Sequence, residues 1–155
     1  MSRQCLNETV KAENGIHIRP FSSGDYEDVI ALWRSSGLTI KPSDALPELE
    51  KFCAITPNRL LVAESNGEAR PKRIVGAVIG AFDGRRAWIY HLAVLPNARR
   101  GGVATRLIRE IEQQLRASGA SKVNLLVEPE NVNARQFYKA LGFSEVPLAF
   151  FTKEL

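Results

Sequence analysis

The sequence has few cysteines and no long hydrophobic run, and both absences restrict the kind of protein that it encodes. Cys5 and Cys53 are the two cysteines among 155 residues, and they form no C-x-x-C motif. Free thiols in a reducing compartment are therefore expected. No apolar run approaches the roughly 20 residues that cross a bilayer, and the start of the chain lacks the apolar core of a signal peptide. These features predict a cytoplasmic protein without membrane association, with a flexible tail over residues 1–15.

The sequence also lacks a basic run interleaved with aromatic residues. The 21 Lys and Arg residues outnumber the 17 Asp and Glu residues and give a formal net charge of +4, but the arginines are scattered. Dispersed positive charge suits an anionic small ligand or a solvated surface, whereas a nucleic-acid-binding face would concentrate it. Nucleic acid is therefore not an expected partner. No spacing of cysteine and histidine predicts a metal site.

What the sequence does contain is the hydrophobic content of one globular domain. Hydrophobic residues make up 45% of the chain, and no internal repeat or low-complexity linker divides it, so residues 16–155 are expected to fold as a single domain. Up to residue 94 the apolar spacing predicts two helices and four strands. The helices run from a Ser22 cap, with Asp25 at the capping-box position, to Gly37 and over Pro47–Ala54. The strands cover Ile16–Arg19, Leu60–Glu64, Ile74–Phe82 and Ala87–Val94, with a hairpin turn at Asp83-Gly84.

The second half of the sequence predicts a strand–helix–strand crossover. The strand that ends at Val94 is followed by an amphipathic helix over Val103–Ser118 and a buried strand over Lys122–Val127. Two strands joined in this way run parallel in one sheet. The expected fold is α/β (α+β), with a mixed, mostly antiparallel sheet of six to seven strands and helices on both faces. Its last elements are a helix over Asn133–Leu141 and strands over Phe143–Val146 and Leu148–Lys153.

A pair of glycines, Gly101 and Gly102, stands directly before the Val103–Ser118 helix. Glycine weakens a helix by about 1 kcal/mol relative to alanine, so the pair needs a reason. The unpaired N–H groups at a helix N-terminus attract anions, and glycine lets a phosphate approach the backbone. Arg99 and Arg100 would add positive charge beside it. The pair is therefore either a phosphate cradle or a plain turn.

Two motifs together resemble those of one known family. R-x-x-G-x-A covers Arg99–Ala104, after L-A-V-L-P at Leu92–Pro96, and N-x-x-A-x-x-F-Y-x-x-L-G-F covers Asn131–Phe143. In this order, and separated by a strand, they resemble the GNAT family of acetyl-CoA-dependent N-acetyltransferases over about residues 74–143 of this chain. Within the family, the layout resembles a small bacterial subgroup with no settled substrate.

The resemblance implies a GNAT fold whose sheet splays open between two parallel strands, with the pantetheine arm of acetyl-CoA in the gap. The backbone of Leu92, Ala93 and Val94 would pair with the arm. Asn131 would bind near the thiol end of the arm, cap the following helix, or do both. The pyrophosphate would be held by the residues of the glycine loop, which are Arg99, Arg100, Gly101, Gly102, Val103, Ala104 and Thr105.

The resemblance leaves the general base open. Related enzymes often carry a glutamate on one of the two splayed strands, but the corresponding positions here hold Trp88 and Leu126. Tyr90, His91 and Glu128 remain as candidates. Strand alternation places Tyr90 and His91 on opposite faces of the sheet unless a bulge intervenes.

The implied function is transfer of an acetyl group from acetyl-CoA to a primary amine, on a protein N-terminus, a lysine or a small molecule. Tyr138 would act as the general acid and as part of the coenzyme site, because a phenol is protonated at neutral pH. The alternative for Tyr138 is a purely structural role, as an aromatic residue on the apolar face of a helix. The alternative function is a non-catalytic acyl-CoA-binding sensor or regulatory module. Families of this kind favour homodimers.

Overall fold

The computed structural model describes residues 15–55, 57–66 and 72–155. Cys5, Gly67 and nearly all of the expected tail over residues 1–15 lie outside these ranges. Two compact units are present: the first extends to Leu125, and the second covers Leu126–Leu155. The expectation that residues 16–155 form a single domain stays a prediction. Within the described ranges, no helix has the length and apolar character needed to span a membrane.

A five-stranded sheet forms the centre of the first unit. The strands lie in the order β1-β2-β3-β4-β5; the first four are antiparallel to their neighbours, whereas β4 and β5 are parallel. This arrangement confirms the predicted mixed, mostly antiparallel sheet with one parallel crossover. The strands are β1 (Ile16–Pro20), β2 (Arg59–Ser65), β3 (Arg73–Phe82), β4 (Ala87–Val94) and β5 (Val123–Asn124).

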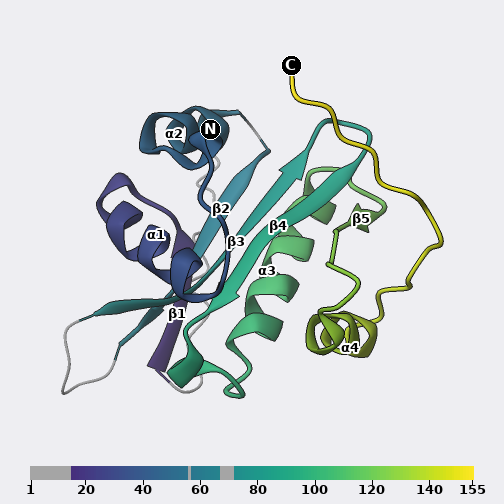
Figure 1. Cartoon of the computed structure of the whole chain (residues 1–155). Helices are drawn as coiled ribbons and strands as arrows, with labels where there is room; N and C mark the ends of the chain where they lie inside the picture. Colours follow the sequence, from purple (N-terminus) through teal and green to yellow (C-terminus); the bar gives the residue numbers. More distant parts are fainter. Residues whose placement is uncertain (1–14, 56, 67–71) are drawn as a thin grey trace, which may run out of the picture. The chain divides into compact units, whose positions relative to one another are not determined.

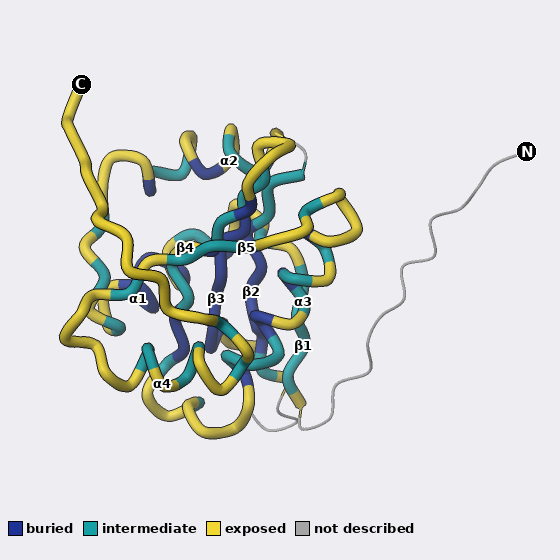
Figure 2. The backbone as a smooth tube through the Cα atoms, turned by 90° about the vertical axis from the view of Figure 1, so that its right-hand side faces the viewer, coloured by how far each residue is buried: buried dark blue, intermediate teal, exposed yellow. Residues whose placement is uncertain are grey.

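Helices cover both faces of this sheet, as predicted. Helices α1 (Tyr26–Ser35) and α2 (Leu46–Ala54) lie on one face, and α3 (Val103–Ala117) lies on the other (Figure 1). Strands β2 and β3 are therefore buried almost along their whole length (Figure 2), which explains their near-continuous apolar sequences. On the α1 face, the core includes the fully buried Trp33 together with Val62 and Ile79.

Two glycines of β3 let α3 pack closely against the sheet. A Cβ atom added to Gly76 would lie 3.0 Å from Leu107 Cδ1, and one added to Gly80 would lie 2.5 Å from Ile111 Cγ1. The second distance is shorter than real Cβ contacts allow. Helix α3 therefore occupies space that an ordinary side chain at residue 80 would fill, and its N-terminus is fixed relative to the end of β4.

The described residues contain five strands rather than the expected six to seven. The strand predicted over Lys122–Val127 is reduced to β5, and the segments Phe143–Val146 and Leu148–Lys153 are not in strands. Apolar alternation shows which residues suit a strand, but a strand forms only where a partner supplies a hydrogen-bond ladder. The C-terminal segment makes local backbone bonds instead, such as that from the Leu148 N–H to the Val146 carbonyl.

An ion-pair cluster joins β1 to β2 and to the turn before α1. The Arg19 guanidinium donates to both carboxylate oxygens of Asp25, at 2.7 and 2.8 Å, and to Glu64 at 2.8 Å. Asp25 also accepts the Ser22 N–H at 2.8 Å, as the capping-box pattern predicts. Hydrogen bonding to Arg19 holds the pKa of Asp25 and the pKa of Glu64 below their usual values. Lys72 adds an exposed contact to Glu64 at 3.3 Å.

Candidate functional site

The loop between β4 and α3 carries the first predicted motif. After Val94 the chain passes through the short turn η4 (Pro96–Ala98), and α3 begins at Val103. Gly102 is the N-cap of α3 and has φ +79°, in the left-handed region that favours glycine. Arg100 also has a positive φ, +65°, which costs an arginine about 1 kcal/mol or more. The glycine pair therefore makes a specific backbone turn.

The same turn leaves the N-terminus of α3 open. Gly102 offers no side chain to cap the helix, and no side chain of the described residues bonds at that position. A Cβ atom added to Gly102 would meet no atom within 4 Å, and one added to Gly101 would meet the Ala98 carbonyl only at 3.7 Å. Unpaired N–H groups at the start of a 15-residue helix carry partial positive charge. An anionic group thus fits the backbone of Gly101–Thr105.

The two arginines before the glycines have different surroundings. Arg99 Nε donates to the carbonyl oxygen of Val94 at 3.0 Å, so this side chain ties the loop back to the end of β4. Arg100 is exposed. From the sequence, both arginines are expected to add charge beside the loop. The structure gives Arg99 a positioning contact as well.

Strand β4 has a free edge next to this loop. Its pairing with β5 consists of Ala87 opposite Val123 and Trp88 opposite Asn124. From Ile89 to Val94, within the described residues of the first unit, β4 has a strand partner on the β3 side alone. The backbone of Leu92, Ala93 and Val94 therefore lies on a strand edge that an extended ligand could join.

A bulge interrupts β4 where it pairs with β3. Ala93 lies opposite Ala77 and Tyr90 lies opposite Ile79, so β4 has one residue more than β3 in this interval. His91 has φ +50°, which identifies it as the bulged residue. Ile79 belongs to the core on the α1 face, and His91 contacts α1. The bulge thus places Tyr90 and His91 on the same face, which simple alternation forbids.

His91 is packed between α1 and the turn η3 (Pro42–Asp44). Its ring meets the Trp33 indole edge-on, with centroids 4.8 Å apart and planes at 89°. His91 Nε2 is buried and lies 3.3 Å from Oδ1 of Asp44. The pair is within ion-pair distance, although its alignment does not meet the geometry of a hydrogen bond. Trp33 itself is a fully buried core residue.

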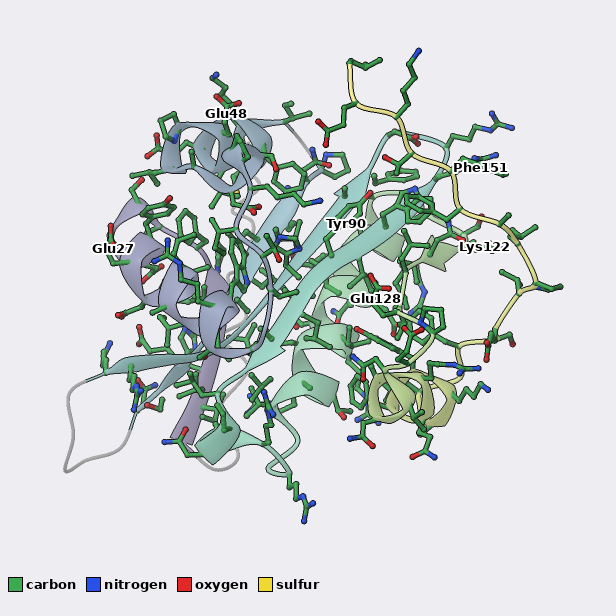
Figure 3. All side chains as sticks on the ribbon, viewed as in Figure 1. Glu27, Glu48, Tyr90, Lys122, Glu128 and Phe151 are labelled. Carbon is green, nitrogen blue, oxygen red and sulfur yellow. The ribbon has the colours of Figure 1, made fainter. Side chains whose placement is uncertain are left out.

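Tyr90 is a weaker candidate for the base than its position suggests. Burial, with the negative charge of Asp83 as a smaller cause, raises the pKa of the Tyr90 phenol. Only the phenolate form can accept a proton from an amine, and a raised pKa lowers the fraction of phenolate at neutral pH. Its ring stacks on Trp88 with centroids 6.2 Å apart, and the residue, labelled in Figure 3, is 42% exposed. The two rings form an aromatic surface beside His91.

The second unit carries the other motif. Helix α4 (Val132–Ala140) begins after Asn131, whose Oδ1 accepts the Ala134 N–H at 3.1 Å, so the predicted capping role of Asn131 is confirmed. Tyr138 lies on α4 with its ring edge-on to Phe137 at 5.1 Å and to Phe143 at 5.4 Å. Burial raises the pKa of the Tyr138 phenol to about 12. Tyr138 is thus a protonated donor throughout the neutral range.

The predicted site residues fall into two groups. Residues of β4, the glycine loop and the start of α3 are contiguous in the first unit, whereas Glu128, Asn131 and Tyr138 belong to the second. Glu128 is exposed in the loop before α4 (Figure 3). Asp44 is not among the site residues predicted from the sequence. Nothing in the linear sequence pairs it with His91, because the contact depends on the bulge and on the path of the segment between α1 and α2.

The comparisons with known proteins agree with this geometry. The model of the acetyltransferase (GNAT) family matches residues 26–143. An acetyltransferase of Pectobacterium atrosepticum is 36% identical over 140 residues, which cover 90% of this chain and 96% of the relative. The chain belongs to the GNAT family of acetyltransferases. The GNAT resemblance found in the sequence is confirmed.

Solved structures show the same GNAT fold. An aminoglycoside N-acetyltransferase in complex with CoA superposes with a TM-score of 0.75 at 19% identity, over 94% of this chain and 98% of that one. Glucosamine-6-phosphate N-acetyltransferase from Arabidopsis thaliana gives a TM-score of 0.70 at 17% identity, over 89% and 97%. The present protein, as a member of the GNAT family, is an enzyme that transfers acetyl groups. The family uses acetyl-CoA as the donor. The two neighbours have different acceptors by name, so the fold alone does not identify an acceptor.

Proposed function

We propose that the protein transfers the acetyl group of acetyl-CoA to a primary amine by direct attack of the amine on the thioester. One observation supports this most strongly: the uncapped N-terminus of α3 at Gly102 follows the free edge of β4, with one short loop between them. The backbone of Gly101–Thr105 would hold the diphosphate of the coenzyme, with Arg100 adding charge. Leu92, Ala93 and Val94 would pair with the pantetheine arm, and Asn131 would bind near its thiol end.

The proposed role of Tyr138 is donation to the leaving sulfur. The amine nitrogen forms a bond to the carbonyl carbon, the C–S bond breaks, and the thiolate takes a hydrogen bond or the proton of the phenol. Because the pKa of Tyr138 is about 12, the phenol is a weaker acid than a thiol. Its main contribution is therefore a hydrogen bond to the developing thiolate, and a phenolate would recover its proton at once.

The amine itself must lose a proton before or during attack. A lysine-type amine has an ordinary pKa of about 10 and an α-amino group one of about 8, so both are mostly protonated at neutral pH. Of the three candidate bases, the raised pKa of Tyr90 disfavours it, and Glu128 is exposed in the second unit. His91 is half-buried, with its Nε2 3.3 Å from a carboxylate, on the strand that would hold the arm. We propose His91 as the base.

Two measurements test the proposed function. Isothermal calorimetry should register binding of acetyl-CoA by the pure protein, and Gly102→Val should weaken it strongly because valine is strained at φ +79° and crowds the N-terminus of α3. A matched change, Gly84→Val, removes a glycine of similar φ, +88°, in the Asp83-Gly84 turn and should leave the affinity unchanged. A thiol-release screen with amines, amino sugars and peptides would then identify the acceptor.

The outcomes distinguish an acetyltransferase from a non-catalytic acyl-CoA sensor. Binding of acetyl-CoA together with amine-dependent thiol release supports the transferase. Binding without thiol release across the panel would instead support an acyl-CoA sensor. If both glycine variants bind acetyl-CoA as tightly as the wild type, the N-terminus of α3 is not part of the coenzyme site. A cytoplasmic location and a homodimer remain proposals, and light scattering of the purified protein tests the second.

A further inference from the structure

We infer that Asp44 is a positioning residue, which holds His91 in the tautomer and orientation that let it take a proton from the acceptor amine. The inference rests on the proposed function. It goes beyond that function because it assigns a role to a turn between α1 and α2 that neither predicted motif includes.

The imidazole of His91 is held on two sides. The bulge at φ +50° turns its side chain toward α1, where the Trp33 indole packs against the ring edge-on. Nε2 is buried, has no hydrogen-bond partner among the described residues, and lies 3.3 Å from Asp44 Oδ1. A buried nitrogen without a partner is costly, and the nearest charged group can only accept. A small rotation of either side chain would complete the bond.

Asp44 is itself fixed in place. Its side chain is 7% exposed, and its Oδ2 accepts the Lys41 N–H at 2.8 Å, which closes the turn η3. That bond occupies one carboxylate oxygen and leaves Oδ1 directed at His91. A carboxylate needed only to close the turn would not require its second oxygen beside the buried Nε2 of an imidazole.

This arrangement determines which ring nitrogen is free. A carboxylate is an acceptor only, so the neutral imidazole carries its hydrogen on Nε2, facing Asp44, and keeps its lone pair on Nδ1. Nδ1 then takes the proton that the amine loses as the N–C bond forms, and Asp44 stabilises the imidazolium until the proton passes to solvent. Among the described residues, the uncharged Trp33 indole on α1 also contacts the ring, and Tyr90 precedes His91 along β4.

The position of His91 along β4 fits this role. It immediately precedes Leu92, Ala93 and Val94, which lie on the free edge of the strand. A pantetheine arm that extends from the glycine loop back along this edge passes Val94 first and reaches His91 last. The reactive end of the arm would thus lie nearest to the bulge.

The sharpest variant is Asp44→Asn. The asparagine oxygen can still accept the Lys41 N–H, so the turn is retained, but its NH2 group faces Nε2 and forces the hydrogen onto Nδ1. We expect kcat at neutral pH to fall about 100-fold, as loss of a general base does, with acetyl-CoA affinity unchanged. The loss should disappear above about pH 10, where the amine is already neutral. His91→Gln should show the same loss and recovery, and the double variant should be no worse than either single change.

A spectroscopic readout tests the positioning without turnover. The chain has two histidines, His17 and His91, so nitrogen-15 spectra are readily assigned with His17→Gln, which should keep full activity. Wild-type His91 should show the Nε2–H tautomer and Asp44→Asn the Nδ1–H tautomer. An unchanged tautomer, a kcat loss equal at every pH, or additive losses in the double variant would overturn the inference. A protein that binds no acetyl-CoA, yet shows the tautomer switch, would contradict the proposed function and leave the pairing of Asp44 and His91 supported.

Discussion

At the scale of single residues, the two candidate proton-transfer groups differ in how their surroundings act on them. Tyr138 is enclosed by aromatic rings, and burial alone raises its pKa to about 12. His91 lies beside the carboxylate of Asp44. An apolar enclosure keeps a phenol protonated, whereas the carboxylate of Asp44 can only accept a hydrogen from the imidazole beside it. The environments therefore suit opposite roles, a donor at Tyr138 and an acceptor at His91.

Replacing Tyr138 by phenylalanine removes the donor and keeps the ring. We expect kcat to fall more than tenfold, because the leaving thiolate loses a hydrogen bond, while the calorimetric affinity for acetyl-CoA stays within about twofold. Because the pKa of Tyr138 is raised to about 12, wild-type kcat should show no loss attributable to this phenol up to about pH 10. Phe137→Leu is the matched control on the same helix. Equal kcat in wild type and Tyr138→Phe would exclude Tyr138 from the chemistry.

At the scale of elements, the contact between α3 and β3 holds the glycine loop in place. Helix α3 buries Val103, Leu107, Ile108, Ile111 and Leu115 against the sheet, and its first turn follows directly from the loop. The approach is close because Gly76 and Gly80 have no side chains. Any residue that pushes α3 away from β3 also moves the backbone amides at its N-terminus.

Gly80→Ala tests this contact. The added Cβ atom would lie 2.5 Å from Ile111 Cγ1, so the helix must shift or repack, at a cost of about 1–3 kcal/mol in the free energy of unfolding. Gly24→Ala is the control, because its Cβ atom would meet only Ser22 Oγ at 4.0 Å. Urea denaturation of both variants measures the difference. If Gly80→Ala were as stable as Gly24→Ala, the packing between α3 and β3 would be looser than described.

The elements were largely predictable, and the reasons for the exceptions are physical. β4 and α3 were predicted at or within one residue of their limits, because apolar periodicity is a local signal. The bulge at His91 and the contact with Asp44 were not predictable, since they depend on how β4 registers with β3. The short β5 and the missing C-terminal strands reflect pairing, which is a property of two segments rather than one.

At the scale of the whole molecule, acid stability depends on the cluster around Arg19. Its two carboxylates, Asp25 and Glu64, have lowered pKa values in the folded state. A lowered folded-state pKa gives stability that is present above the ordinary carboxyl pKa of about 4 and is lost as the pH falls through the lower folded-state value. The free energy of unfolding should therefore decline as the pH falls below about 4.

Arg19→Met leaves both carboxylates buried without their partner. We expect a loss of about 2 kcal/mol at pH 7, less than for a fully buried pair because the Arg19 side chain is 26% exposed. The loss should shrink as the pH falls below 4, because protonated carboxyls no longer need the guanidinium. Lys72→Met is the control: the lysine is 75% exposed and should contribute less than about 1 kcal/mol. A pH-independent loss would contradict the ionic origin.

The extra residue at position 91 has a consequence for reading relatives of this enzyme. Before His91 the even-numbered residues of β4, such as Tyr90, lie on the α1 face of the sheet. After it the odd-numbered residues, such as Ala93, lie on that face, because the bulge inserts one extra residue. A homologue with a regular strand here would present a histidine at the aligned position to the other side of the sheet. Roles can therefore be transferred along this strand only between proteins that share the irregularity.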